Sequence, residues 1–98
     1  MSLPVIFRPV ARLEMDEAMA WYKGRKLGLE AEFKAAVDQM IERIAVTPLR
    51  FRPVRGGIRR GLLRRFPYAI YFLPEPDAII VLAVFHTKRD PSRLEGRE

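Results

Sequence analysis

The run of eight apolar residues from Ala78 to Phe85 constrains the fold of this chain more than any other stretch. It has no polar side chain and follows the turn-forming segment Pro74 to Asp77, so it predicts a buried strand. It is far shorter than the roughly 20 residues that a membrane-spanning helix needs. A strand that is apolar on both faces needs cover on both sides of its sheet. With no further chain to supply the second cover, a partner is its simplest source, and a concave or tightly packed sheet is the alternative.

Two amphipathic helices are predicted in the first half of the chain, over about Val10 to Lys26 and Leu29 to Val46. In each, apolar residues recur at spacings of four, three and four, the period of one helical face. These residues are Ala11, Met15, Ala18 and Tyr22 in the first helix and Phe33, Val37, Met40 and Ile44 in the second. The short link between the helices predicts an antiparallel hairpin. We expect Trp21 to lie in the core rather than to form a ligand platform.

The other elements are predicted as strands. Val5 to Phe7 lies between two prolines, which favours a position at or near a sheet edge. Arg50 to Gly57 is interpreted as a loop, Ile58 to Arg65 as a weak strand and Tyr68 to Leu73 as a strong one. The resulting order β-α-α-β-β-β predicts an α+β fold, with a helix hairpin on one face of a mainly antiparallel sheet. The length predicts a single domain over residues 1–98.

Positive charge is concentrated in the second half of the chain. Residues 1–49 hold seven basic and seven acidic residues, whereas residues 50–98 hold eleven and five, so the net charge of +6 arises there. The segment from Arg50 to Arg65 contains seven arginines and no acidic residue. The planar guanidinium of arginine suits phosphate and carboxylate groups. The cluster therefore predicts an anionic partner, either nucleic acid or an acidic protein segment, with a solvated basic surface as the alternative.

Few residues could carry out catalysis. The chain has no cysteine, which excludes disulfides, thiolate metal sites and a cysteine nucleophile. The one histidine, His86, is a candidate general acid or base, and a strand-end residue bonded to backbone is the alternative. No carboxylates cluster near it in sequence, so we expect neither a metal site nor a cofactor. The N-terminus has no long apolar segment, and we expect a cytoplasmic protein that does not enter the membrane.

The chain resembles the RelE/ParE toxin superfamily of bacterial toxin–antitoxin systems, also called plasmid stabilisation proteins, over nearly its whole length. The order of elements carries the resemblance, together with RFPYAIY from Arg65 to Tyr71 and VLAVFHTKRDP from Val81 to Pro91. Further matching residues are Ala11, Glu14, Ala18, Trp21, Tyr22, Gly28, Leu29, Phe33, Ile44, Pro48, Val54, Arg55, Arg59 and Arg93. The resemblance implies a toxin wrapped by the C-terminal segment of a cognate antitoxin. Apolar anchors and acidic residues of such a segment would cover the dry sheet face and neutralise the arginines.

The superfamily divides by target, since RelE-like members cut messenger RNA on the ribosome and ParE-like members poison DNA gyrase. RelE-like toxins typically carry an arginine where this chain has Ala69, and this chain has no lysine or glutamate base between Arg50 and Arg65. These departures favour a ParE-like gyrase inhibitor that is not an enzyme. His86 supports the alternative, a ribosome-dependent endoribonuclease with His86, Arg60 and Arg65 as catalytic candidates. The residues expected to bind the antitoxin or the target are Arg55, Arg59, Arg60, Arg64, Arg65, Tyr71, His86, Lys88, Arg89 and Arg93.

Overall fold

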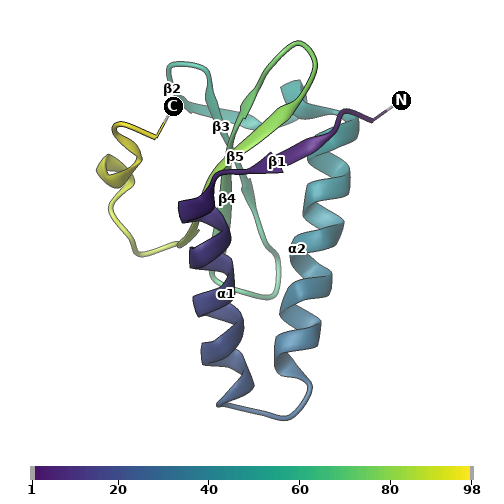
Figure 1. The fold of residues 1–98 in the computed structure, drawn as a ribbon, viewed down its shortest axis with the longest axis vertical. Helices are drawn as coiled ribbons and strands as arrows, with labels where there is room; N and C mark the ends of the chain where they lie inside the picture. The colour runs from purple at the N-terminus through teal and green to yellow at the C-terminus, as the bar shows by residue number, and fades with distance from the viewer. Residues whose placement is uncertain (1, 98) are drawn as a thin grey trace.

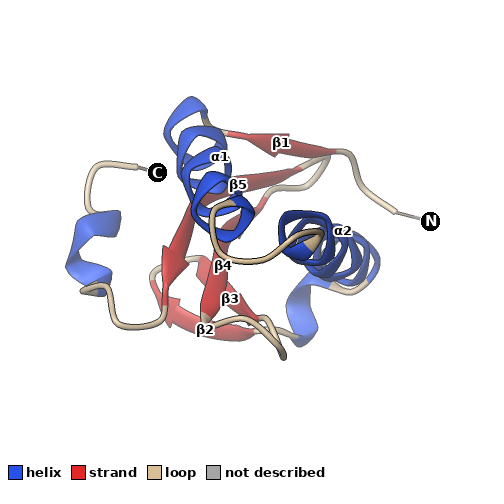
Figure 2. Ribbon diagram, turned by 90° about the horizontal axis from the view of Figure 1, so that it is seen from below, coloured by secondary structure: helices blue, strands red, loops and turns tan. Residues whose placement is uncertain are grey.

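Two helices cover one face of a five-stranded sheet in the computed structural model, which describes residues 2–97 (Figures 1 and 2). Helices α1 (Pro9–Lys23) and α2 (Leu29–Val46) lie side by side as an antiparallel hairpin. The predicted bounds of α2 are confirmed, whereas α1 ends three residues earlier than predicted. Gly28, which precedes α2, has a φ of 83°, a left-handed conformation that glycine adopts without strain and that helps the chain reverse direction.

The sheet has the strand order β1-β5-β4-β3-β2. Its strands are β1 (Val5–Phe7), β2 (Arg52–Arg55), β3 (Ile58–Leu62), β4 (Tyr68–Pro74) and β5 (Ile79–His86). The edge strand β1 pairs parallel to β5, and all other neighbours are antiparallel. The predicted α+β fold with a helix hairpin on a mainly antiparallel sheet is thereby confirmed.

The prediction of a loop from Arg50 to Gly57 is wrong for Arg52–Arg55, which form β2. The turn at Gly56 and Gly57 reverses the chain, and Gly56 takes a φ of 52° there. β2 then pairs with β3 at the edge of the sheet, where Pro53 is tolerated because one side of the strand needs no hydrogen-bonding partner. The turn at Gly56 and Gly57 therefore joins β2 and β3 into a hairpin, which the arginine-rich composition did not predict.

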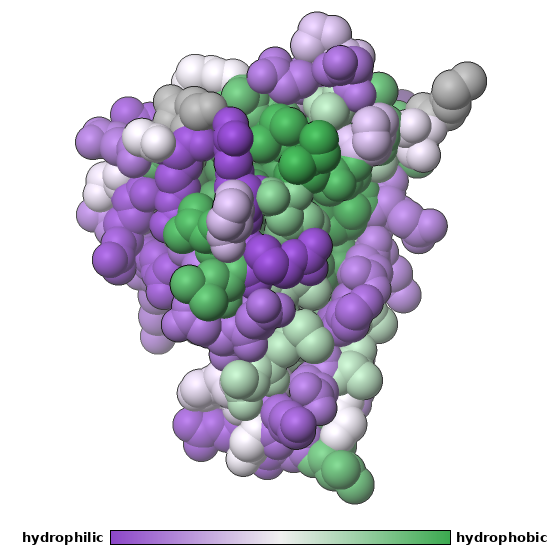
Figure 3. Space-filling model, in the orientation of Figure 1, coloured by the Kyte–Doolittle hydropathy of each residue, from purple (hydrophilic) through white to green (hydrophobic). Residues whose placement is uncertain are grey.

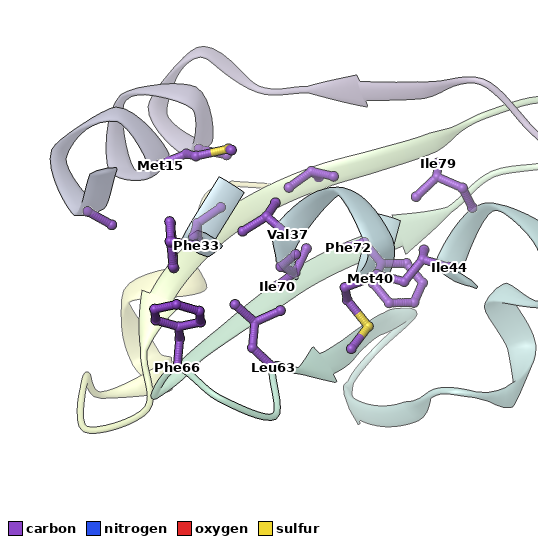
Figure 4. Packing of buried hydrophobic residues seen from close by; sticks show 14 of the residues in the cluster. Met15, Phe33, Val37, Met40, Ile44, Leu63, Phe66, Ile70, Phe72 and Ile79 are labelled. Carbon is purple, nitrogen blue, oxygen red and sulfur yellow. The ribbon is translucent and has the colours of Figure 1, made fainter. Parts of the chain in front are cut away.

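The larger of two apolar cores lies between the helix hairpin and the sheet (Figure 4). All eight residues predicted for the apolar faces of the two helices are buried in it. Strand residues such as Phe72 complete it from the sheet. Gly61 brings β3 close to α2, because a Cβ atom at this position would lie 2.8 Å from the Sδ atom of Met40. Any larger residue at this position would therefore force the Met40 side chain to move.

The second core lies on the outer face of the sheet, away from the helices. It consists of Ile58, Ala69, Tyr71, Leu82, Ala83, Phe85 and Leu94. Leu94 comes from the short 3-10 helix η2 (Pro91–Leu94) and is fully buried. The prediction that no chain remained to cover this face is wrong, because the C-terminal tail folds back over it. At the start of η2, the Asp90 carboxylate accepts a hydrogen bond from the Ser92 N–H, and this contact lowers the pKa of Asp90.

None of the helices in the described part of the chain has the length and apolarity needed to cross a bilayer.

Candidate functional site

A β-bulge interrupts the register of β5, and Glu14 of α1 is bound at it. Leu82 is the extra residue, since Phe72 pairs with Val81 and Tyr71 with Ala83. The partner strand β1 ends before the bulge, so the edge of β5 has no strand neighbour there. The Val84 N–H instead donates to the Glu14 carboxylate at 3.0 Å. A side chain from a helix thus replaces a ladder hydrogen bond.

Arg97 of the C-terminal tail completes this arrangement. Its guanidinium donates to both carboxylate oxygens of Glu14 at 3.0 Å and to the Leu82 carbonyl at 3.1 Å. Arg89 donates to Glu14 at 3.2 Å, and both arginines lie over the Phe85 ring. The Glu14 side chain is 9% exposed. Glu14 was identified from the sequence only as a residue that matches the superfamily, and Arg97 was assigned no role, since 83 residues separate this pair.

The predicted arginines are distributed over both faces of the sheet. Arg59 points to the helix side, where it donates to the Phe51 carbonyl at 2.7 Å. Strand alternation places its neighbour Arg60 on the outer face, across from buried Tyr71. Arg55 forms an ion pair with Glu95 of the tail at 3.6 Å. These arginines are therefore not one continuous patch.

Arg64 and Arg65 follow β3 and approach α2. Arg65 donates to Glu32 at 2.6 Å, and this hydrogen bond is the main cause of the lowered pKa of Glu32. Arg64 lies at a groove of about 370 Å³, which we call the arginine groove. Its lining residues are Ala36, Gln39, Met40, Arg43, Leu63, Arg64 and Arg65. It combines cationic walls with apolar side chains.

An apolar groove of about 610 Å³ lies between the other side of α2 and the N-terminal segment. It is lined by Ser2, Leu3, Val5, Ile41, Glu42, Arg43, Ala45, Val46 and Thr47. Val46 is 60% exposed, and the nearby Leu49 is 70% exposed. Figure 3 shows an apolar patch at the end of the molecule where β1 and the C-terminal end of α2 lie. The two grooves share Arg43 and so flank one helix.

His86 lies at a third groove of about 470 Å³, between α1 and the ends of β4 and β5. We call it the aromatic groove, and its lining residues are Glu14, Glu17, Ala18, Trp21, Tyr22, Pro67, Tyr68, Val84, His86 and Arg89. The Nδ1 atom of His86 accepts a hydrogen bond from the Lys88 N–H at 3.2 Å, so the neutral ring carries its proton on Nε2. Trp21 is 53% exposed, and the prediction that it lies in the core is wrong.

The three catalytic candidates of the ribonuclease interpretation do not meet at this groove. His86 lines it, but neither Arg60 nor Arg65 does. Arg60 lies on the opposite face of the sheet, and Arg65 is bound to Glu32 of α2. Of the remaining predicted residues, Arg89 joins His86 at the groove, and Arg93 lies in η2. Among residues 2–97, no three His, Asp or Glu side chains gather closely enough to hold a metal ion.

Comparison with known proteins identifies relatives of the chain. The family model "ParE toxin of type II toxin-antitoxin system, parDE" matches residues 5–91. A chain of the chromosomal ParDE toxin–antitoxin system from P. aeruginosa has a TM-score of 0.71 at 19% identity, over 87% of this chain and 96% of that chain. A chain of the toxin–antitoxin complex RelBE2 from Mycobacterium tuberculosis has a TM-score of 0.64 at 22% identity, over 88% of this chain and 92% of that chain. No curated protein matches the sequence significantly.

Proposed function

Because the chain belongs to the ParE toxin family of type II toxin–antitoxin systems, we propose that it inhibits DNA gyrase by protein contact and is neutralised by a cognate antitoxin. One observation favours gyrase over the ribosome as the target: His86, Arg60 and Arg65 lie apart from one another. RNA cleavage needs an acid or base within hydrogen-bonding reach of the reacting group and cations at the phosphate. These side chains do not converge on one cavity.

The residue at position 69 adds to this support. The resemblance to RelE-like toxins predicts an arginine there, and Ala69 is instead buried in the outer core. A guanidinium at this position would have to enter that apolar core, which contains Tyr71 and Phe85 and is covered by Leu94. The outer face of the sheet is therefore packed, and it offers less room for RNA than an uncovered face would.

The antitoxin interface that we propose consists of the two grooves that flank α2. An acidic segment would pair with Arg43 and Arg64 in the arginine groove, while apolar anchors would enter the apolar groove beside Val46. Charge complementarity would speed the encounter, and the buried apolar anchors would supply most of the affinity. This assignment places the antitoxin on the helix side, because the tail already covers the outer face.

A supercoiling assay tests the proposed target. Purified toxin added to gyrase and relaxed plasmid should block the appearance of supercoiled DNA, and prior addition of the antitoxin should restore it. In parallel, primer extension on translated messenger RNA should show no new ends. Undisturbed supercoiling at an excess of toxin would refute gyrase inhibition.

The same primer extension tests the second candidate function, a ribosome-dependent endoribonuclease. The exposure of His86 to the aromatic groove is the one observation that favours it. Cuts that disappear in His86→Ala but persist in Lys88→Ala would support this alternative. If the wild-type chain makes no cuts, the ribonuclease hypothesis fails.

A further inference from the structure

We propose that the aromatic groove binds a guanine nucleotide unit, with the base against Trp21 and Glu17 and the phosphate toward Arg89 and His86. This site is separate from the grooves beside α2 and goes beyond the proposed action on gyrase. Its volume of about 470 Å³ lies within the range of roughly 300–1,000 Å³ that is usual for small-molecule sites.

Aromatic side chains offer the base a stacking surface. Trp21 lines the groove and is half-exposed, and the Arg25 guanidinium lies over its ring, 4.2 Å from the ring centre. The Tyr22 and Trp21 rings pack edge to face with their centroids 5.1 Å apart, and the centroids of Tyr22 and Tyr68 are 6.1 Å apart. Flat bases bind to such surfaces by stacking.

The acceptor of the groove is the carboxylate of Glu17. This side chain is exposed and forms no hydrogen bond or ion pair within residues 2–97. The neighbouring Glu14 differs, because Arg97 and Arg89 already occupy its oxygens. Glu17 therefore offers two oxygens that can accept a pair of adjacent N–H groups.

The groove also carries donors. His86 presents the Nε2–H that remains when its Nδ1 accepts from Lys88, and Arg89 is oriented by its contact with Glu14. A guanidinium and an imidazole N–H are suited to a phosphate group. The hydroxyl of Tyr68 is a further donor, since a phenol is protonated at neutral pH and burial raises the pKa of this side chain further.

This order of groups selects guanine among the bases. The Watson–Crick edge of guanine presents two adjacent donors, N1–H and the amino group, which match one carboxylate. Adenine and cytosine place a ring-nitrogen acceptor beside the amino group, and uracil flanks its single N–H with two carbonyls, so each turns an acceptor toward Glu17. A cationic side chain of a protein partner would instead meet Arg89, and the net charge of +6 favours an anionic ligand.

Trp21 is the only tryptophan of the chain, so its fluorescence reports directly on this groove. The full-length protein is titrated separately with GMP, AMP, CMP and UMP. We expect a saturable change with GMP and affinity at least about tenfold higher than for the other three, from the range of one bidentate contact. A response that does not saturate, or that is equal for all four nucleotides, would overturn the proposal.

Glu17→Gln tests the carboxylate, because a carboxamide cannot accept two hydrogen bonds from adjacent N–H groups. GMP affinity should fall about 5- to 150-fold, while AMP affinity should not fall, because a carboxamide can pair with the amino group and ring nitrogen of adenine. Glu75→Gln is the matched control, since Glu75 is exposed in the turn at the opposite end of β4 and β5. Equal GMP affinity in Glu17→Gln and Glu75→Gln would contradict the assignment.

Two further measurements complete the test. Trp21→Ala, followed by calorimetry with GMP, should lose at least about fivefold in affinity if the base stacks there. A short oligothymidine with one guanosine then distinguishes the source of the ligand: binding tighter than GMP indicates a guanine in a single strand, and binding no tighter indicates a free nucleotide. Failure of both GMP and the oligonucleotide to bind would refute the site and would leave the gyrase and antitoxin assays unaffected.

Discussion

Replacement of Glu14 by alanine should destabilise the protein more than replacement of any other acidic residue in the described chain. Four hydrogen bonds end on its carboxylate, one from the Val84 N–H, two from Arg97 and one from Arg89. Glu14→Ala removes all of them and leaves the edge of β5 without a partner at the bulge. It also removes the contact that holds Arg97 of the tail to α1.

The magnitude follows from what is left unpaired. Removal of one member of a buried ion pair costs about 3–5 kcal/mol, and a buried N–H without an acceptor costs about 1–3 kcal/mol. The Arg97 side chain is 18% exposed, so it can turn to solvent and reduce the first cost. We therefore expect a loss of about 3 kcal/mol, a large part of the roughly 5–15 kcal/mol that stabilises a domain of this size.

Thermal and urea unfolding followed by circular dichroism measure this loss. For a chain of this length, about 3 kcal/mol corresponds to a decrease in Tm of roughly 12–24 °C. Glu17→Ala is the matched control, because Glu17 lies three residues further along α1 and forms no ion pair within residues 2–97. Its effect should stay within about 0.5 kcal/mol. In a double-mutant cycle with Arg97→Ala, the two losses should not add. Equal stability of the Glu14 and Glu17 variants, or full additivity in the cycle, would refute the reasoning.

Three more predictions address packing and charge. Gly61→Ala should cost about 1–3 kcal/mol, read from the urea midpoint, because the new methyl group would approach Met40 within 2.8 Å. Leu94→Ala should cost about 2–5 kcal/mol and increase binding of a hydrophobic dye to the outer face, because Leu94 is fully buried. The Arg65–Glu32 pair lowers the pKa of the carboxyl, so it should stabilise the fold above the ordinary value of 4.5 and lose this effect as pH falls through the folded value. The stability difference between wild type and Arg65→Ala should therefore shrink on acidification.

Each of these predictions has a control and a contrary outcome. Gly24→Ala is the control for Gly61→Ala, because it adds a methyl group where the nearest atom is 3.6 Å away. An equal loss of unfolding free energy in both variants would contradict the close packing of β3 on α2. Leu62→Ala removes a half-exposed leucine of the outer face, so dye binding as strong as in Leu94→Ala would argue against a covering tail. For the acid series, an unchanged difference between pH 7 and about pH 3 would exclude the contribution of Glu32.

The core and the helices could be predicted from the sequence because their signals are local. The four-three-four spacing in α1 and α2 depends only on neighbours within a helix, and it identified the residues that now face the sheet. The same holds for β4 and β5, whose composition predicts strands wherever they pair. The strand β2 was missed because its pairing follows from the turn at Gly56 and not from its own residues.

The candidate site was harder to predict, since its parts are distant in sequence. The strand-end position of His86 was predicted, but its placement beside Trp21 requires α1 to lie across the end of β5. The arginines were treated as one patch because they are close together in the sequence, between Arg50 and Arg65. Alternation along β3 separates Arg59 from Arg60, so neighbours in the chain lie on opposite faces of the sheet.

The sequence by itself determined the layers of this protein, since apolar periodicity and turn residues specify which segments become helices or strands. Only the tertiary structure decided how the apolar strand Ala78 to Phe85 is covered. It also decided which groups bond to the backbone at the edge of this strand. β1 ends too early to pair with the bulge, and a helix carboxylate and a tail guanidinium from opposite ends of the chain take its place. No local pattern encodes that contact, because it exists only after the helix, the bulge and the tail have met.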